Sequence, residues 1–167
     1  TEPQDLPTDG SPVVNVDRGG KLTWHGPGQL VGYPIVRLKE KGRVREYVDF
    51  LEKALMDVIA QYGIRTVQIP ERSGVWVPAD DKGPDRKIAA IGLRVKQGVS
   101  MHGFALNCSN SLEPYDTVVA CGITDAGVTT ISAEIGRTVT PAEILPAVQE
   151  ALNAGADAHI ASAVVLN

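Results

Sequence analysis

The sequence predicts an α+β domain with a mixed, largely antiparallel sheet flanked by helices. Stretches typical of strands outnumber those typical of helices, and pairs joined by short turns outnumber long crossovers. A length of 167 residues fits one domain, 1–167, that buries enough surface to fold without a metal or disulfide. The sequence shows neither repeats nor a low-complexity tract that would divide it.

The first half of the chain is expected to supply two strands, a glycine-rich connection and a helix. Residues 13–16 (VVNV) and 30–38 (LVGYPIVRL) have the composition of strands and flank the connection. From Val44 to Tyr62 apolar residues recur at steps of three and four, and Gly63 follows where a helix would end. This pattern predicts the clearest helix of the chain, packed on the core through one face.

The second half is expected to add several strands and a second long helix. Strands are expected at residues 65–69, 74–77, 87–95 and 99–106, with a turn at Gln97-Gly98 and a solvated loop at 78–86. Thr140-Pro141-Ala142-Glu143 has the pattern of a capping box with proline in the first turn, which predicts a helix extending to about Ala158. Pro146 is expected to kink this helix or to delay its start.

The composition argues against several classes of protein. With 16 basic and 20 acidic residues the net charge is −4, which argues against a general nucleic-acid binder. No apolar run approaches the roughly 18 residues of a membrane span. Two cysteines, Cys108 and Cys121, make no disulfide framework and favour a reducing compartment, so a cytoplasmic location is expected. Because the chain starts at Thr1 without methionine, an amino-terminal segment is expected to be missing.

The segment RGGKLTWHGPGQ, Arg18 to Gln29, concentrates glycine, proline and histidine near the amino end. Glycine has no Cβ, so such a segment lets a ligand approach the backbone closely. A hairpin turn is an equally good interpretation, since turns also concentrate glycine and proline. The segment contains neither the P-loop pattern nor GxGxxG, so it predicts no nucleotide-phosphate loop of these types.

Cys121 is the candidate nucleophile, at the end of the apolar run TVVACGI and directly before Gly122. For a lone cysteine a buried, inert thiol is the commoner situation, and Cys108 has less to recommend it. Lys87 opens the strand expected at 87–95, and most lysines are solvated surface residues. A nearby ammonium lowers a thiol pKa from its usual ~8.5, so Lys87 could activate the cysteine and then move protons.

The histidines and the charged stretches allow both structural and functional interpretations. His25 and His102, each next to a glycine, are alternative bases for a cysteine, although structural histidines are commoner, and His159 invites no role. The spacing of His, Cys, Asp and Glu predicts no metal site. The acidic residues of the loop at 78–86 are interpreted as solvated side chains that keep the loop soluble: Asp80, Asp81 and Asp85. The basic residues of the stretch from Arg37 to Arg45 are either a solvated helix entrance or a docking patch for an acidic partner: Arg37, Lys39, Lys41, Arg43 and Arg45.

Four motifs in order resemble the lipoyl(octanoyl) transferase family over most of the chain: RGGKLTWHGPGQ, KIAAIG from Lys87, HGFALN from His102 and ACGI around Cys121. The resemblance implies a biotin/lipoate protein ligase-like fold and transfer of an octanoyl group in lipoate biosynthesis. The donor would be octanoyl-acyl carrier protein. The acceptors would be lipoyl domains of 2-oxoacid dehydrogenases and the glycine cleavage H protein. The resemblance implies that the protein needs no cofactor and binds neither nucleic acid nor a membrane.

The resemblance also assigns residues to roles. Cys121 would carry the acyl thioester, and Lys87 would lower its pKa and act as acid and base. The acyl-binding residues would be Arg18, Gly19, Gly20, Lys21, Leu22, Thr23, Trp24, His25, Ala90, Ile91, Gly92, Gly103, Phe104 and Ala105. Two positions depart from the family pattern: Trp24 replaces the usual tyrosine, and Ala120 replaces a proline that often precedes the cysteine.

Other functions remain open at this point. An ATP-dependent lipoate or biotin ligase would share the fold but would not need the thiol of Cys121. A noncatalytic acyl-binding module would have an inert Cys121. A Cys/His hydrolase would release free acid instead of forming an amide.

Overall fold

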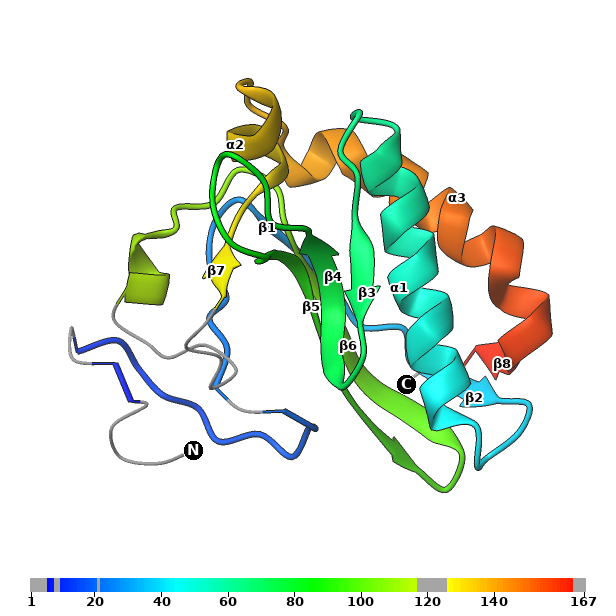
Figure 1. The fold of residues 1–167 in the computed structure, drawn as a ribbon. Coiled ribbons are helices and arrows are strands. Elements are labelled where there is room, and N and C mark those ends of the chain that lie inside the picture. Colours follow the sequence, from blue (N-terminus) through cyan, green and yellow to red (C-terminus); the bar gives the residue numbers. More distant parts are fainter. Residues whose placement is uncertain (1–5, 8–9, 21, 117–125, 164–167) are drawn as a thin grey trace.

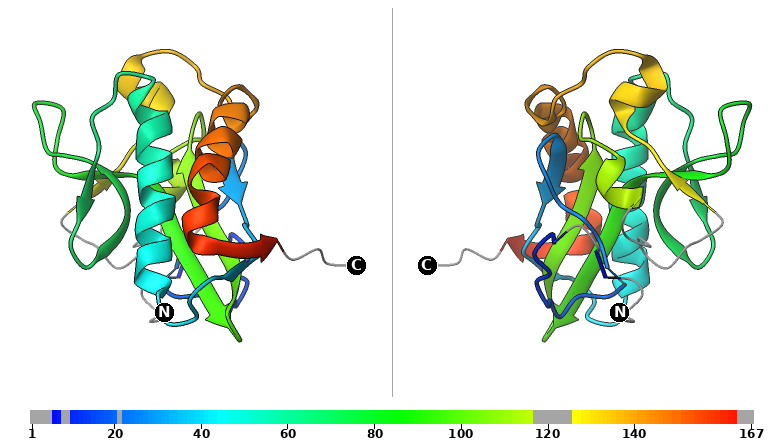
Figure 2. Two further views of the ribbon diagram at one scale, coloured as in Figure 1. Left: turned by 90° about the vertical axis from the view of Figure 1, so that its right-hand side faces the viewer. Right: turned by 90° about the vertical axis from the view of Figure 1, so that its left-hand side faces the viewer.

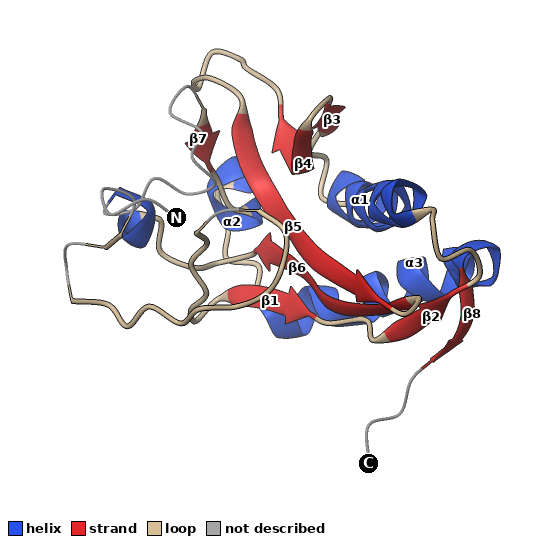
Figure 3. Ribbon diagram, turned by 90° about the horizontal axis from the view of Figure 1, so that it is seen from below, coloured by secondary structure: helices blue, strands red, loops and turns tan. Residues whose placement is uncertain are grey.

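The sheet of the molecule curves around two long helices. The computed structural model describes residues 6–7, 10–20, 22–116 and 126–163. Seen from below, the sheet wraps around α1 (Val44–Ala60) and α3 (Pro141–His159), whereas residues 10–20 lie on its other side (Figures 1 and 3). The glycine-rich segment is therefore placed on the side of the sheet that the long helices leave open.

The strand order is β3-β4-β5-β6-β2-β8, with β1 also pairing with β6 and β7 with β5. The strands are β1 (Gln29–Gly32), β2 (Val36–Leu38), β3 (Val67–Ile69), β4 (Arg72–Val77), β5 (Arg86–Lys96), β6 (Val99–Asn107), β7 (Gly127–Val128) and β8 (Ile160–Ala163). The pairing of β5 with β7 is parallel, and the other pairings are antiparallel. The predicted mixed, largely antiparallel sheet is confirmed.

The centre of the sheet is the long β5–β6 hairpin. Its register runs from Ala89 opposite Leu106 to Lys96 opposite Val99. Gln97 and Gly98 join the strands with φ of +52° and +79°. Two central residues with positive φ match the twist of a tight hairpin, so the predicted turn is confirmed. The expected strands at 65–69 and 74–77 are also present, as β3 and β4.

The helices follow their sequence signals closely. Helix α1 buries a stripe of apolar side chains that are at most 1% exposed, Tyr47, Leu51, Leu55, Val58 and Ile59, and Gly63 follows with φ of +77°. Helix α3 starts at Pro141, where the Thr140 hydroxyl accepts a hydrogen bond from the Glu143 N–H. Pro146 lies inside α3, so it does not delay the start of the helix.

The two long helices lie side by side on the sheet (Figure 2). Phe50 of α1 stacks on His159 of α3 with ring centroids 4.8 Å apart. A Cβ on Gly155 would lie 2.3 Å from the Phe50 ring, so the small residue allows the helices to approach. A separate short helix, α2 (Ile131–Ile135), precedes α3 in the sequence, and Thr130 is its N-cap.

Of two strand predictions near the amino end, one is wrong and the other is only partly right. Residues 13–16 form no strand, and Val14 remains 76% exposed. The sequence pattern is suited to a strand, but β6 is already paired by β5 on one side and by β1 and β2 on the other. The strand expected at 30–38 divides into β1 and β2 around Pro34, which has no N–H to donate to a ladder.

Candidate active site

A cavity of about 240 Å³ lies between the β5–β6 hairpin, the glycine-rich segment and the turn from β3 to β4. The predicted site residues that line it are Arg18, Gly20, Thr23, His25, Lys87, Ala90, Ile91, Gly92, Gly103, Phe104 and Ala105. Residues from three separate motifs of the sequence therefore surround one space. Ile91 and Phe104 also belong to the hydrophobic core, so the wall they form is apolar and fixed.

The other predicted site residues are placed differently. Leu22 and Trp24 line a neighbouring cavity of about 350 Å³, together with valines of the amino-terminal segment. The Gly19 N–H donates to the carbonyl of Leu93 at 3.1 Å and so attaches the segment to β5. Lys21 and Cys121 lie outside the residues that the structure describes. Cys108 is fully buried, and burial raises the pKa of its thiol to about 11, so it is not a reactive cysteine.

Glycines allow the glycine-rich segment and the strands to approach closely. A Cβ on Gly92 would lie 3.0 Å from Arg18 Cδ and 3.2 Å from Gly19 O. A Cβ on Gly103 would lie 2.2 Å from the carbonyl oxygen of Gly32, so that contact has no room for any side chain. Both strands therefore need glycine at these positions, because other segments pack closely against them beside the cavity.

Gly92→Ala should push the Arg18 side chain and the Gly19 backbone away from β5 by a few tenths of an ångström. We expect KM for a substrate bound in this cavity to rise roughly fivefold, equivalent to about 1 kcal/mol, with kcat little changed. Steady-state kinetics measures this split. Gly42→Ala is the matched control, because a Cβ there meets nothing within 4 Å. An unchanged KM in Gly92→Ala would show that the segment does not contact the substrate.

Lys87 reaches the cavity from the start of β5. Its Nζ lies 4.8 Å from the centroid of the buried Trp76 ring, where a cation is attracted by the ring face. Its stem crosses Gly74, which has φ of +122° and whose Cβ would lie 3.4 Å from Lys87 Cε. The Lys87 carbonyl accepts a hydrogen bond from the Thr129 N–H at 3.0 Å. Both the backbone and the stem of this lysine are therefore held in place.

Sequence reasoning missed several residues of the cavity wall. Tyr33, Glu71, Arg72 and Ser73 line it, and so does His102, which had been considered only as an alternative base. Glu71 and His102 have φ of +66° and +61°, a conformation that costs energy in a residue with a side chain. His102 is fixed there by an edge contact with the Tyr33 ring and by Asp17, whose carboxylate lies 3.1 Å from its Nε2. Such backbone angles leave no signal in the sequence.

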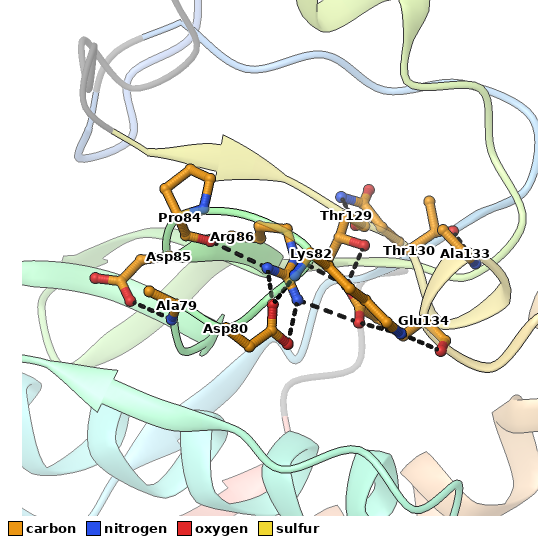
Figure 4. Close-up of polar contacts among 11 residues, drawn as sticks. Ala79, Asp80, Lys82, Pro84, Asp85, Arg86, Thr129, Thr130, Ala133 and Glu134 are labelled. Carbon is orange, nitrogen blue, oxygen red and sulfur yellow. Dashed lines mark hydrogen bonds and ion pairs between the residues drawn. The ribbon is translucent and has the colours of Figure 1, made fainter.

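Arg86 lies next to Lys87 and is buried between two carboxylates. Its guanidinium donates to both oxygens of Asp80 at 2.9 and 3.0 Å and to both oxygens of Glu134 at 3.0 and 3.3 Å (Figure 4). Only 9% of the Arg86 side chain and 8% of that of Glu134 are exposed. The predicted solvated loop therefore ends before Arg86, and Asp80 forms an ion pair rather than serving only solubility. The pairing could not be expected because Glu134 is distant in sequence.

The electrostatics of this cluster favour its charged form. Hydrogen bonds to Asp80 and then to Glu134 raise the pKa of Arg86 above its ordinary value. Burial alone would raise the pKa of Glu134, but hydrogen bonds from Arg86 and from the Thr129 hydroxyl outweigh it and lower the pKa. The cluster connects the start of β5 to α2 and to the residues that follow β7.

Two features of the described residues bear on other functions. None of these residues forms a group of three His, Cys, Asp or Glu side chains that could hold a metal ion. Among the helices that the structure describes, none is long and apolar enough to cross a membrane.

Comparison with known proteins agrees with this geometry. Residues 1–153 match the family model of the lipoyl protein ligase A/B catalytic domain. An octanoyltransferase of Arthrobacter sp. (strain FB24) is 57% identical over 162 residues, which are 97% of this chain and 73% of that protein.

Solved structures share the fold at low identity. A bi-partite lipoate protein ligase from Thermoplasma acidophilum superimposes with a TM-score of 0.65 at 15% identity, over 82% of this chain and 55% of that one. The biotin protein ligase of Aquifex aeolicus gives 0.61 at 14% identity, over 78% and 54%. The chain thus spans about half the length of these two structures, and the expected biotin/lipoate ligase-like fold is confirmed. The chain belongs to the lipoyl protein ligase A/B catalytic-domain family and, within it, to the octanoyltransferases.

Proposed function

We propose that this chain moves an octanoyl group from a carrier thioester to a protein lysine through a thioester on Cys121. The observation that carries the proposal is the cavity at which Lys87, the glycine-rich segment and an apolar wall meet. A hydrocarbon chain lying against Ile91 and Phe104 would gain about 0.8 kcal/mol for each buried methylene. The cavity thus supplies both an apolar site for the chain and a cation near the reacting carbonyl.

In the first half-reaction, the thiolate of Cys121 attacks the thioester carbonyl of the donor. The ammonium of Lys87 lowers the pKa of this thiol and gives its proton to the departing carrier sulfur. Backbone N–H groups near the carbonyl, such as those of Ala90 to Gly92, would stabilise the oxyanion. The exchange of one thioester for another is nearly neutral in energy.

In the second half-reaction, the ε-amine of the acceptor lysine attacks the acyl-enzyme. Lys87, now without its proton, takes a proton from the incoming ammonium. The product is an amide, which is more stable than the thioester, so the reaction requires no ATP. The two half-reactions make a ping-pong scheme.

The donor is proposed to be octanoyl-acyl carrier protein, and the acceptors are proposed to be lipoyl domains. A reducing compartment such as the cytoplasm suits a mechanism that depends on a free thiol. The basic stretch from Arg37 to Arg45 stays a candidate for carrier docking. Arg43 is paired there with Glu40 at 2.7 Å and with Glu46 at 3.1 Å, which favours the simpler interpretation of a solvated helix entrance.

Incubation with an octanoyl carrier thioester should add one octanoyl group to the protein, on Cys121. Intact-mass and peptide mass spectrometry measures the adduct. Cys108→Ser is the matched control and should keep the adduct, because the buried Cys108 thiol is not ionised. Transfer by a Cys121→Ala variant at the wild-type rate would overturn the covalent mechanism.

A further inference from the structure

A buried chain of side-chain amides connects His25 to the backbone beside Lys87. Gln29 Nε2 lies 2.8 Å from Asn107 Oδ1, and Asn107 Nδ2 lies 3.1 Å from the carbonyl oxygen of Thr129. At the other end Gln29 Oε1 lies 2.7 Å from His25 Nδ1. Gln29 and Asn107 are 9% and 4% exposed and face each other across the β1–β6 pairing, so both amides sit on a rigid support.

Backbone carbonyls at two points fix the direction of this chain. A carbonyl oxygen only accepts, so the Asn107 atom at Thr129 must be the amide nitrogen, and its oxygen must face Gln29. The Gln29 nitrogen also faces the carbonyl of Trp24 at 3.4 Å, which gives the same orientation independently. Rotating either amide would bring oxygen against oxygen in a buried site, at a cost of about 1–3 kcal/mol for each unsatisfied group.

The orientation of Gln29 determines the tautomer of His25. Because Gln29 presents its oxygen, His25 Nδ1 must carry the hydrogen. A neutral imidazole has a single N–H, so Nε2 keeps a free lone pair. The His25 ring lines the cavity that Lys87 also lines, and the residue is exposed, so a substrate can reach it.

Amide formation needs a second proton acceptor besides Lys87, and the free lone pair of His25 Nε2 can serve as one. An ε-ammonium loses two protons as it becomes a secondary amide, and a single lysine takes them one at a time. Thr129 connects the two proton acceptors, Lys87 and His25. Its N–H donates to the carbonyl of Lys87, and its own carbonyl accepts from Asn107 at the end of the chain of amides that holds His25.

We propose that His25 Nε2 accepts the second proton of the attacking amine, and that Gln29 and Asn107 are positioning residues that hold its tautomer. This role rests on the proposed acyl transfer. The amine lone pair forms the C–N bond while the electrons of the C–S bond leave with the sulfur of Cys121. The nitrogen of the new C–N bond gives its second proton to His25 Nε2. The resulting imidazolium passes this proton to the thiolate of Cys121 or to water.

The tautomer can be measured in the intact protein without substrate. Long-range ¹H–¹⁵N correlation spectra of the three histidines, with His25 assigned from a His25→Ala variant, should show the Nδ1–H form for His25. Gln29→Leu removes the acceptor and should restore the Nε2–H form that free histidine prefers. An Nε2–H tautomer in the wild-type protein would overturn the inference whatever the protein catalyses.

The role can be measured on the isolated octanoyl-enzyme. His25→Ala should slow transfer to a lipoyl-domain lysine by roughly 10²-fold and acylation of Cys121 by less than about tenfold, because only transfer needs the proton acceptor, and added imidazole should restore part of the transfer rate. His159→Ala is the histidine control, since that ring stacks on Phe50 of α1, and it should leave both steps unchanged. Equal slowing of both steps, or of neither, would overturn the role of His25 alone. Failure of the wild-type protein to form an acyl-enzyme would overturn the proposed function and this role with it.

Discussion

Lys87→Met should slow both half-reactions by roughly 10³-fold, within the range that a positioned acid and base contributes. Methionine keeps an unbranched apolar stem that can lie across Gly74 and against Trp76, so the loss reports the missing ammonium rather than a change of packing. Single-turnover measurements of adduct formation and of transfer to the acceptor separate the two steps. The pH midpoint for alkylation of Cys121 should also rise toward that of a free thiol.

The control for this variant is another lysine-to-methionine change. Lys53→Met removes an exposed partner of Asp49 on α1, with 62% of the lysine side chain in solvent, and should leave both rates unchanged. If Lys87→Met slowed only the second half-reaction, the lysine would act on the amine but would not activate the thiol. If neither step changed, Lys87 would have no part in the chemistry.

The elements predicted correctly from sequence have local causes. Helix α1 follows from one apolar stripe with Gly63 after it, and the start of α3 follows from Thr140, Pro141 and Glu143 alone. The β5–β6 hairpin follows from two strand-like runs around a Gln97-Gly98 turn. In each case the deciding signal lies within a short stretch of the sequence.

The features that the sequence predicted wrongly depend on partners elsewhere in the chain. Val13 to Val16 has a strand composition, but β6 offers it no place to pair, since both sides of β6 are occupied. Arg86 could be recognised as buried only from Glu134, which is 48 residues away. A carboxylate and a guanidinium at that separation look like ordinary solvated charges in a sequence.

The candidate site was only partly accessible to sequence reasoning. Motif order brought together residues on β5, β6 and the glycine-rich segment, and the fold places most of them round one cavity. The contribution of the β3–β4 turn was missed because Glu71 owes its position to a positive φ. The contact between Lys87 and Cys121 remains a prediction, since Cys121 lies outside the described residues.

Arg86→Met should destabilise the protein by about 3–5 kcal/mol, the usual cost of removing one partner from a buried ion pair. Among the residues that the structure describes, the change leaves Glu134, which is 8% exposed, with the Thr129 hydroxyl at 2.7 Å and Lys82 at 3.7 Å to compensate its charge. Methionine fills a similar volume, so the loss reports the uncompensated carboxylate rather than a cavity. Urea denaturation at pH 7, with the free energy of unfolding extrapolated to water, measures the effect.

Arg137→Met is the matched control, because Arg137 also binds a glutamate, Glu143 at 3.0 Å, but with 56% of its side chain exposed. That variant should lose less than about 1 kcal/mol. The pH dependence gives an independent check: the folded-state pKa of Glu134 is lowered, so its contribution is present above the ordinary carboxyl pKa of about 4 and is lost as pH falls through the lowered value. The difference between wild type and Arg86→Met should therefore shrink in acid. A difference that persists there, or equal losses for the two arginines, would mean that the buried cluster does not stabilise the fold through its charges.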